Sequence, residues 1–204
     1  VGKSNYTYNG PLNIDENAFN IYRKTFNEFG LGVKTEIDLP VESLGYIGTN
    51  KAPDLLLNYS IGQYDTYTPI QLSQYITTIA SNGKRYKPQL LKEVYESTKG
   101  NNLGKLAYKV EPIILNTVTT KPEYLARIQE GFKAVMTIGL GKNVMGDSPN
   151  PAGKTGTSES FIDTDNDGKI DTETVSNAFV GYAPFENPEM TITVTSPDVE
   201  DPNT

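Results

Sequence analysis

The chain has no cysteine and no histidine among its 204 residues. It therefore cannot use a cysteine nucleophile, a histidine general base, a Ser-His-Asp triad or an ordinary zinc site. Any acid–base chemistry depends on lysine, aspartate, glutamate or tyrosine. An apolar run of 18 residues is also missing, as is a basic stretch followed by an apolar leader, so this chain is predicted to hold no membrane span or export signal.

Basic side chains are outnumbered: 18 Lys and Arg stand against 25 Asp and Glu, which gives a net charge of −7. Such an acidic balance, without a basic run, argues against nucleic acid as a partner. Hydrophobic residues make up 36% and charged residues 21%, so a packed core is expected rather than disorder. The length suits one domain or a large piece of a bigger one, and the start at Val1 without Met favours a piece.

Three segments carry apolar residues at helical spacing, in the regions 15–30, 68–83 and 122–138. The second begins with a capping box, formed by Thr68 as the N-cap and Gln71 three residues later. We expect that capped helix to be part of the scaffold. The predicted buried faces consist of Phe19, Tyr22, Phe26 and Phe29 in the first helix, Leu72, Tyr75, Ile76, Ile79 and Ala80 in the second, and Leu125, Ile128, Phe132, Val135 and Met136 in the third.

Strand patterns are concentrated near the end of the chain. An apolar segment at 179–183, a five-residue turn at 185–189 and an alternating run at 190–195 predict an antiparallel hairpin. The stretch around Lys154 is predicted to be a third strand, which a polar loop at 163–174 joins to the hairpin. Helices followed by an antiparallel sheet predict an α+β fold.

The sharpest short motif is Lys-Thr-Gly-Thr at 154–157. At the edge of a sheet, Lys154 would supply positive charge, while the hydroxyls of Thr155 and Thr157 would donate to a carboxylate. Gly156 would let a substrate lie close to the backbone, and the N–H of Thr157 would form half of an oxyanion hole. Taken alone, the tripeptide favours a plainer interpretation, a glycine-containing turn with an exposed lysine.

A phosphate-binding loop is the other chemical interpretation of Gly153-Lys154-Thr155. It requires a glycine at position 148, where the chain has Ser148, and Gly146 lies two residues too early. No strand-to-helix pattern follows the motif. The phosphate-binding interpretation is therefore rejected.

Further segments, in order along the chain, resemble the transpeptidase domain of class B penicillin-binding proteins from about Gly30 to Pro188. Lys-Thr-Gly is one of the three motifs that mark these serine acyltransferases and the related serine β-lactamases. The segments that carry the resemblance are Phe-Gly-Leu-Gly at 29–32, Ile-Asp-Leu-Pro at 37–40 with Glu42, Gly-Gln-Tyr-Asp at 62–65, Thr-Pro-x-Gln-Leu at 68–72, Ala-Ser-Asn-Gly at 80–83 and Val-Gly-Tyr-Ala-Pro at 180–184.

The resemblance implies a serine β-lactamase-like fold, of which residues 1–204 would be the C-terminal portion of a single transpeptidase domain. It implies a serine enzyme that cross-links peptidoglycan stem peptides and is acylated by β-lactams, which makes it a target in antibiotic resistance. Lys154 and Thr157 would be catalytic, and Lys154, Thr155, Gly156 and Thr157 would bind substrate. No cofactor is implied. The family works on the outer face of the bacterial cytoplasmic membrane through an anchor outside this chain, with division or elongation proteins as candidate partners.

The family's other two motifs have only misplaced matches here. Ser-x-x-Lys matches at Ser81-Asn-Gly-Lys84, at the C-terminal end of a helix, whereas a nucleophile belongs at a helix N-terminus. Ser-x-Asn matches at Ser148-Pro-Asn150, only a few residues before Lys154. We therefore expect the nucleophile in an N-terminal half of the domain that precedes this chain, and we expect apolar faces that this half would cover.

The segment from Asp163 to Thr174 begins like an EF-hand calcium loop, with oxygen ligands at alternate positions and Gly168 at the sixth. The twelfth position should be a bidentate glutamate, but Thr174 occupies it and Glu173 lies one place early. A polar hairpin tip without calcium is the favoured interpretation.

Alternatives from other classes remain open at this point. One is a non-catalytic module of the same fold, either a degenerate relative or a β-lactam sensor, and the other is a calcium-dependent surface protein built on the loop at 163–174. A serine β-lactamase is a variant of the enzyme interpretation. Gly62-Gln63 would either shape a loop near the cleft or have a purely structural role.

Overall fold

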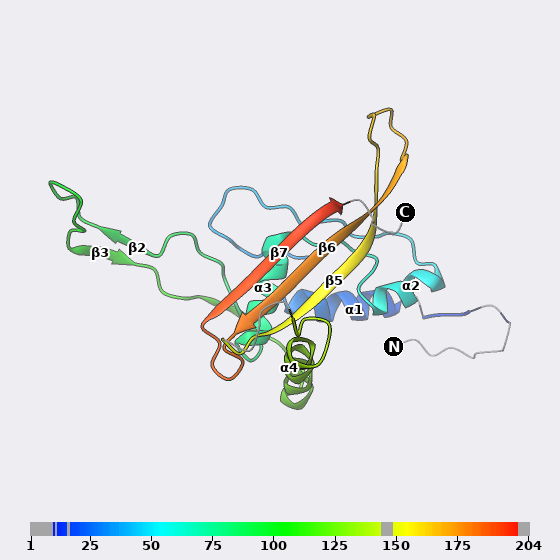
Figure 1. The fold of residues 1–204 in the computed structure, drawn as a ribbon, viewed down its shortest axis with the longest axis horizontal. Helices are drawn as coiled ribbons and strands as arrows, with labels where there is room; N and C mark the ends of the chain where they lie inside the picture. Colours follow the sequence, from blue (N-terminus) through cyan, green and yellow to red (C-terminus); the bar gives the residue numbers. More distant parts are fainter. Residues whose placement is uncertain (1–9, 11, 16, 144–148, 200–204) are drawn as a thin grey trace.

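The computed structural model describes residues 10, 12–15, 17–143 and 149–199. A three-stranded sheet crosses the centre of the molecule, helices lie against it, and a two-stranded arm projects to one side (Figure 1). Helices and antiparallel sheets together confirm the predicted α+β fold. That the chain is the C-terminal portion of one transpeptidase domain stays a prediction.

The three predicted helices are present as α1 (Asn17–Glu28), α3 (Pro69–Ala80) and α4 (Pro122–Thr137). The capping box at the start of α3 is confirmed: the Gln71 N–H donates to Thr68 Oγ1 at 3.4 Å, and the Thr68 N–H donates to Gln71 Oε1 at 3.0 Å. Within the described ranges, every helix is too short or too polar to cross a bilayer.

The predicted buried face of α4 is confirmed for Leu125, Phe132 and Met136, but it is wrong for Ile128, which is 38% exposed. At about 100° per residue, Ile128 lies roughly 60° around the helix from Leu125. It therefore falls at the rim of the stripe that packs against the sheet.

The central sheet has the order β5 (Ala152–Ile162), β6 (Thr172–Ala183) and β7 (Met190–Val199), with both pairs antiparallel. The hairpin and the third strand are confirmed. Strand β6 starts seven residues before the predicted 179, which shortens the polar loop to 163–171. The additional residues at its start are mostly polar or β-branched, so a prediction based on apolar residues did not include them. Such residues nevertheless pair well across strands.

Two helices cover one face of this sheet, because α3 packs against β6 and β7 while α4 packs against β5. Hydroxyl pairs join α3 to β7: Ser73 to Thr193 and Thr77 to Thr191, each at 3.1 Å. The core between these layers consists of Phe29, Ile76, Ile79, Ala80, Val118, Leu125, Phe132, Ala152, Val180 and Tyr182. On the other face of β7, the exposed apolar side chains are Met190, Ile192 and Val194.

Five elements were not predicted from the sequence: α2 (Pro53–Ser60), β1 (Lys84–Tyr86), β2 (Glu93–Tyr95), β3 (Leu106–Lys109) and β4 (Ile114–Thr117). Strand β1 pairs with β4, and β2 pairs with β3 to form the projecting arm (Figure 1). These strands have only three or four residues, too few for an alternating pattern to identify them.

Candidate active site

The Lys-Thr-Gly-Thr motif lies within β5, so the alternative of a glycine-containing turn is wrong. Lys154 is directly opposite Val180 on β6, and Thr157 is opposite Asn177. The Lys154 side chain is exposed, and its Nζ donates to the backbone oxygen of Thr155 at 2.5 Å. An extended backbone presents the motif as a continuous row of groups rather than as a bend.

Strand alternation separates the motif's side chains between the two faces of the sheet. Lys154 lies on the same face as Val180, which the helices bury, whereas Thr155 and Thr157 lie on the opposite face. Strand β5 is the edge of the sheet in the described part of the chain. A ligand can therefore reach the ammonium and both hydroxyls only by lying along that edge, where alternate backbone groups are also available.

The two glycines of this strand differ in what surrounds them. A Cβ atom on Gly153 would lie 2.7 Å from the Phe179 ring and 2.8 Å from the Val180 oxygen, so packing inside this chain requires glycine there. A Cβ atom on Gly156 would have as its nearest neighbour the Ala178 oxygen, at 4.0 Å. Among the described residues, no side chain packs against Gly156. A strand that binds a ligand along its backbone needs such free space.

The Ser-x-x-Lys match at Ser81-Asn-Gly-Lys84 does not place its serine at a helix N-terminus, where a nucleophile is expected. Ser81 is the C-cap residue of α3, Gly83 has a φ of 84°, and Lys84 begins β1. The rejection of this match on the helix-end argument is thus confirmed. The Ser-x-Asn match and the rejected phosphate-loop positions include Ser148 and Gly146, which lie outside the described residues.

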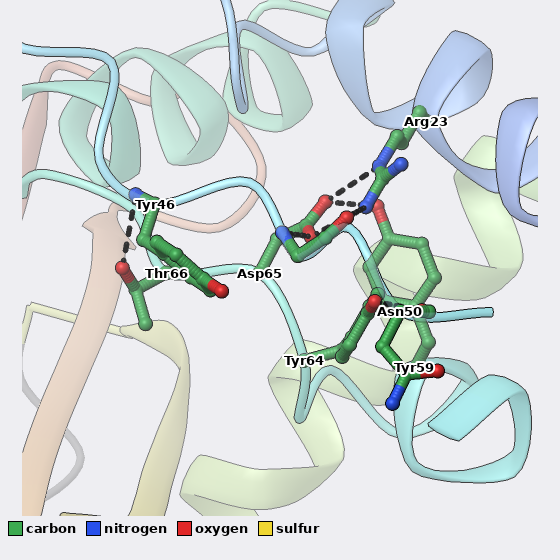
Figure 2. Close-up of polar contacts among 8 residues, drawn as sticks. Arg23, Tyr46, Asn50, Tyr59, Tyr64, Asp65 and Thr66 are labelled. Atoms are coloured by element: carbon green, nitrogen blue, oxygen red, sulfur yellow. Dashed lines mark hydrogen bonds and ion pairs between the residues drawn. The ribbon is translucent and has the colours of Figure 1, made fainter. Parts of the chain in front are cut away.

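Asp65, from the Gly-Gln-Tyr-Asp segment, is the centre of a buried polar group that we call the Asp65 cluster: Arg23, Gly48, Tyr59 and Asp65 (Figure 2). Arg23 binds the carboxylate with two nitrogens, Nε at 2.9 Å and Nη2 at 2.8 Å, and the Tyr59 hydroxyl donates to it at 2.8 Å. The Gly48 N–H donates to Asp65 at 2.9 Å, while Arg23 Nη2 also reaches the Gly48 oxygen at 2.6 Å.

The ionisation of the Asp65 cluster follows from these contacts. Burial alone would raise the pKa of Asp65, but hydrogen bonds from Arg23, the Gly48 N–H and Tyr59 hold that pKa below its ordinary value. The hydrogen bond with Asp65 raises the pKa of Arg23, and burial raises the pKa of Tyr59. The cluster therefore stays a charged pair at neutral pH and joins α1 to the segment before α3. Gly62 and Gln63 are exposed beside it.

The family segment at 68–72 and its neighbour Gln74 form scaffold contacts with the region 33–42. Buried Gln71 donates through Nε2 to the Val33 oxygen at 2.9 Å, and buried Gln74 donates to the Thr35 oxygen at 3.0 Å. The Thr35 N–H in turn donates to the Glu42 carboxylate at 2.7 Å. These contacts hold the loop after α1 against α3, which confirms the scaffold role expected of the capped helix.

The acidic loop, residues 163–171, connects β5 to β6. Ligand atoms of Asp163, Asp165 and Asp171 lie within 4.8 Å of one another, but hydrogen-bond donors of the loop already engage them. The Gly168 N–H donates to Asp163 at 2.7 Å, and the Asp171 carboxylate accepts from the Thr164 hydroxyl at 2.7 Å. Desolvation would raise the pKa of Asp163, but backbone hydrogen bonds outweigh it and lower that pKa, and the Thr164 hydrogen bond lowers the pKa of Asp171. Thr174, at the twelfth position, is buried in β6 and bonded to Ser160 at 2.9 Å.

The described part of the chain also has an open hollow of about 720 Å³ between α1 and the β1–β4 pair, away from the Lys154 strand. Several of its charged side chains are already engaged. Arg23 pairs with Asp65, Arg85 Nε donates to Asn116 Oδ1 at 2.5 Å, and Glu28 accepts from the Thr119 hydroxyl at 2.9 Å. Among the described residues, these three charged side chains of the lining are therefore already paired within the chain.

Asn177 and the partners of Asp65 were not found from the sequence. Arg23 and Asp65 are 42 positions apart, and no spacing pattern links them. Asn177 is positioned by strand register, which was not predicted in that part of β6.

Comparisons with known proteins agree with the motif order. The family described as "Penicillin binding protein transpeptidase domain" matches residues 13–203. Penicillin-binding protein 2A of Bacillus subtilis (strain 168) is 46% identical over 198 residues, which cover 97% of this chain and 28% of that protein. A more distant relative, peptidoglycan D,D-transpeptidase MrdA of Haemophilus influenzae, is 28% identical over 189 residues, covering 82% of this chain and 28% of that protein.

A solved structure gives the same result for the fold. Penicillin-binding protein 2B of Streptococcus pneumoniae (strain R6) has a TM-score of 0.78 and 32% identity to this chain, covering 91% of it and 30% of that structure. The chain spans less than a third of the length of these proteins. With the Lys-Thr-Gly strand, the ordered family segments and these matches, the chain belongs to the transpeptidase domain family of class B penicillin-binding proteins.

Proposed function

We propose that the protein containing this chain is a peptidoglycan D,D-transpeptidase that uses a serine acyl-enzyme and binds β-lactams. The chain would supply the Lys-Thr-Gly wall of the active site. The observation that carries the proposal is the position of residues 154–157 at the exposed edge of the central sheet, with Gly156 open to an incoming ligand. Relatives named as penicillin-binding proteins and a D,D-transpeptidase support it.

In the proposed reaction, a serine oxygen from outside this chain bonds to the carbonyl carbon of the penultimate D-Ala of a stem peptide. A base takes the hydroxyl proton, the peptide bond to the terminal D-Ala breaks, and that D-Ala leaves as a protonated amine. The amine of a second stem peptide then attacks the ester, which forms the cross-link, and the serine oxygen recovers a proton.

This chain's residues would bind and polarise the substrate in that reaction. The ammonium of Lys154 and the hydroxyls of Thr155 and Thr157 would hold the terminal carboxylate of the peptide, or the carboxylate of a β-lactam. The Thr157 N–H would stabilise the oxyanion that forms on the attacked carbonyl. No metal or organic cofactor is part of the proposal.

The proposal extends to the surroundings of the domain. The polypeptide that carries the serine would pack against apolar side chains left exposed here, such as Ile192 and Val194 on β7. The protein would work on the outer face of the bacterial cytoplasmic membrane, held by an anchor outside this chain, alongside division or elongation proteins.

Two assays on the full-length protein test the proposal. Incubation with a fluorescent penicillin should give a stable covalent adduct, and donor and acceptor stem peptides should give a cross-linked dimer with release of D-Ala. Rapid turnover of the penicillin would instead identify a β-lactamase. Stable labelling without cross-linking would identify a non-catalytic β-lactam sensor. No labelling at all would refute the proposal.

A further inference from the structure

Asn177 is the direct cross-strand neighbour of Thr157, on the sheet face opposite Lys154. The Thr157 hydroxyl donates to Asn177 Oδ1 at 2.9 Å, and both side chains are accessible from solvent. Within the described residues, the Nδ2 group of Asn177 makes no hydrogen bond. The Asn177 amide oxygen therefore accepts a hydrogen bond from Thr157, while its amide nitrogen has no hydrogen-bond partner among the described residues.

A hydroxyl has only one proton to donate, and a carboxylate can only accept. Thr157 therefore cannot serve a substrate carboxylate while its proton points at Asn177 Oδ1. A primary amide can resolve this conflict because it accepts through oxygen and donates through nitrogen. If the Asn177 amide turns by half a rotation, Nδ2 donates to Thr157 Oγ1 and the hydroxyl proton becomes available to the carboxylate.

The neighbouring backbone is irregular at this position. The register of β7 against β6 changes between Asn177, opposite Ser196, and Val175, opposite Val199. Strand β7 has one extra residue here, which forms a bulge in which Asp198 has a φ of 51° and donates its N–H to Ser176 Oγ at 3.2 Å. Bulges of this kind change the local twist and redirect side chains, and this one lies directly beside Asn177.

We propose that Asn177 is a positioning residue that sets the direction in which the Thr157 hydroxyl donates, and thereby the binding of carboxylate-bearing substrates. The inference rests on the proposed function. It assigns to Asn177 the switch between two hydrogen-bond directions: acceptor from Thr157 in the free site, and donor to Thr157 when a carboxylate is bound.

Asn177→Asp separates this role from a structural one. An aspartate keeps the oxygen that accepts from Thr157, so it preserves the cross-strand bond seen in the structure, but at neutral pH it has no proton to donate. If Asn177 only joined the two strands, the aspartate variant would match the wild type and Asn177→Ala would be the worse change. Under the proposal the order is reversed, because alanine leaves the Thr157 hydroxyl free to turn.

The measurement is the second-order rate constant for acylation of the full-length protein by a penicillin and by the methyl ester of the same penicillin. For the penicillin we expect a loss of about 10–100-fold in Asn177→Asp, the size of one hydrogen bond to a charged group, and a smaller loss in Asn177→Ala. The ester should react with all variants at nearly equal rates, which also shows that the variants are folded.

Thr157→Val provides the control for charge repulsion, since the carboxylate introduced by Asn177→Asp would repel a substrate carboxylate even without the hydroxyl. In the Thr157→Val background, adding Asn177→Asp should cost clearly less than it does in the wild type. Equal costs in the two backgrounds, an equal loss with the ester, or a fast Asn177→Asp variant would each overturn the inference. If the wild type itself is not acylated by the penicillin, the proposed function fails instead.

Discussion

The Asp65 cluster and the Lys154 strand are both polar, yet they differ in how completely their hydrogen-bonding groups are used. The Asp65 side chain is 1% exposed and accepts hydrogen bonds from an arginine, a tyrosine and a backbone N–H. Lys154 is exposed, and within the described part of the chain its ammonium donates to a neighbouring backbone oxygen. Both segments belong to the family pattern, but only the second has capacity left for a ligand.

This difference predicts that substitutions in the Asp65 cluster reduce stability, whereas substitution of Lys154 changes the reaction. Removing a member of a buried, paired cluster leaves an uncompensated charge, so it should reduce stability. Removing an exposed cation on an edge strand leaves the fold intact, so it should change only the reaction. Three substitutions, a pH series and a calcium titration test that separation, in order of decreasing effect.

Asp65→Asn should have the largest effect, because it leaves Arg23 partly buried and without its counter-charge. Breaking a buried pair in this way costs about 3–5 kcal/mol. We expect a clear fall in the melting temperature of the full-length protein and faster hydrogen exchange around α1. Asp54→Asn, on the exposed first turn of α2, is the matched control and should change little. A melting temperature equal to that of the wild type would show that the cluster is not structural.

The stability gained from Asp65 should also depend on pH. Its pKa in the folded protein lies below the ordinary value of 3.8, so its contribution is complete well above that value and is lost as the pH falls through the lower folded pKa. The difference in melting temperature between wild type and Asp65→Asn should therefore stay constant from about pH 5 to pH 8 and shrink below about pH 4. A difference that grows in acid would contradict the assigned ion pair.

Lys154→Ala should slow acylation by a carboxylate-bearing β-lactam without changing the melting temperature. Loss of a direct contact to a carboxylate is worth about 1.5–3 kcal/mol, or roughly 10–150-fold in rate. Stopped-flow acylation of the full-length protein measures the rate. Lys109→Ala, an exposed lysine on β3, is the control. Equal rates for wild type and Lys154→Ala would remove this lysine from the site.

Thr68→Ala should cost about 1 kcal/mol of stability, because it removes the side-chain cap of α3. Lys121→Ala is the comparison, since Lys121 occupies the N-cap of α4 and makes no cap hydrogen bond there. Denaturant unfolding followed by helix content should show the loss for Thr68 and none for Lys121. If the two variants are equal, the capping box does not contribute.

Calcium should have the smallest effect: adding it, or removing it with a chelator, should leave the melting temperature of the full-length protein unchanged. The carboxylates of the acidic loop are occupied by backbone and hydroxyl donors, and Thr174 at the twelfth position is buried in β6. A bound structural ion would raise the melting temperature by mass action. Such a rise, lost in Asp163→Asn, would show that the loop is a calcium site after all.

The long elements were predictable because each has a local signal. The cap of Thr68 and Gln71, the helical spacing of α1 and α4, and the alternation in β7 all act within a few residues. The short strands β1 to β4 have no such signal. The polar half of β6 was not predicted because its stability comes from cross-strand pairs, such as Ser160 with Thr174, rather than from apolar residues.

The amino-acid sequence by itself determined the fold class, the order of family segments and the Lys-Thr-Gly-Thr motif, since these depend on residue type and local spacing. Only the tertiary structure decided that Lys154 lies on the sheet face that the helices cover, that Asp65 pairs with Arg23, and that Asn177 meets Thr157. The last two contacts join residues 42 and 20 positions apart, and strand register and burial bring them together where no local pattern can.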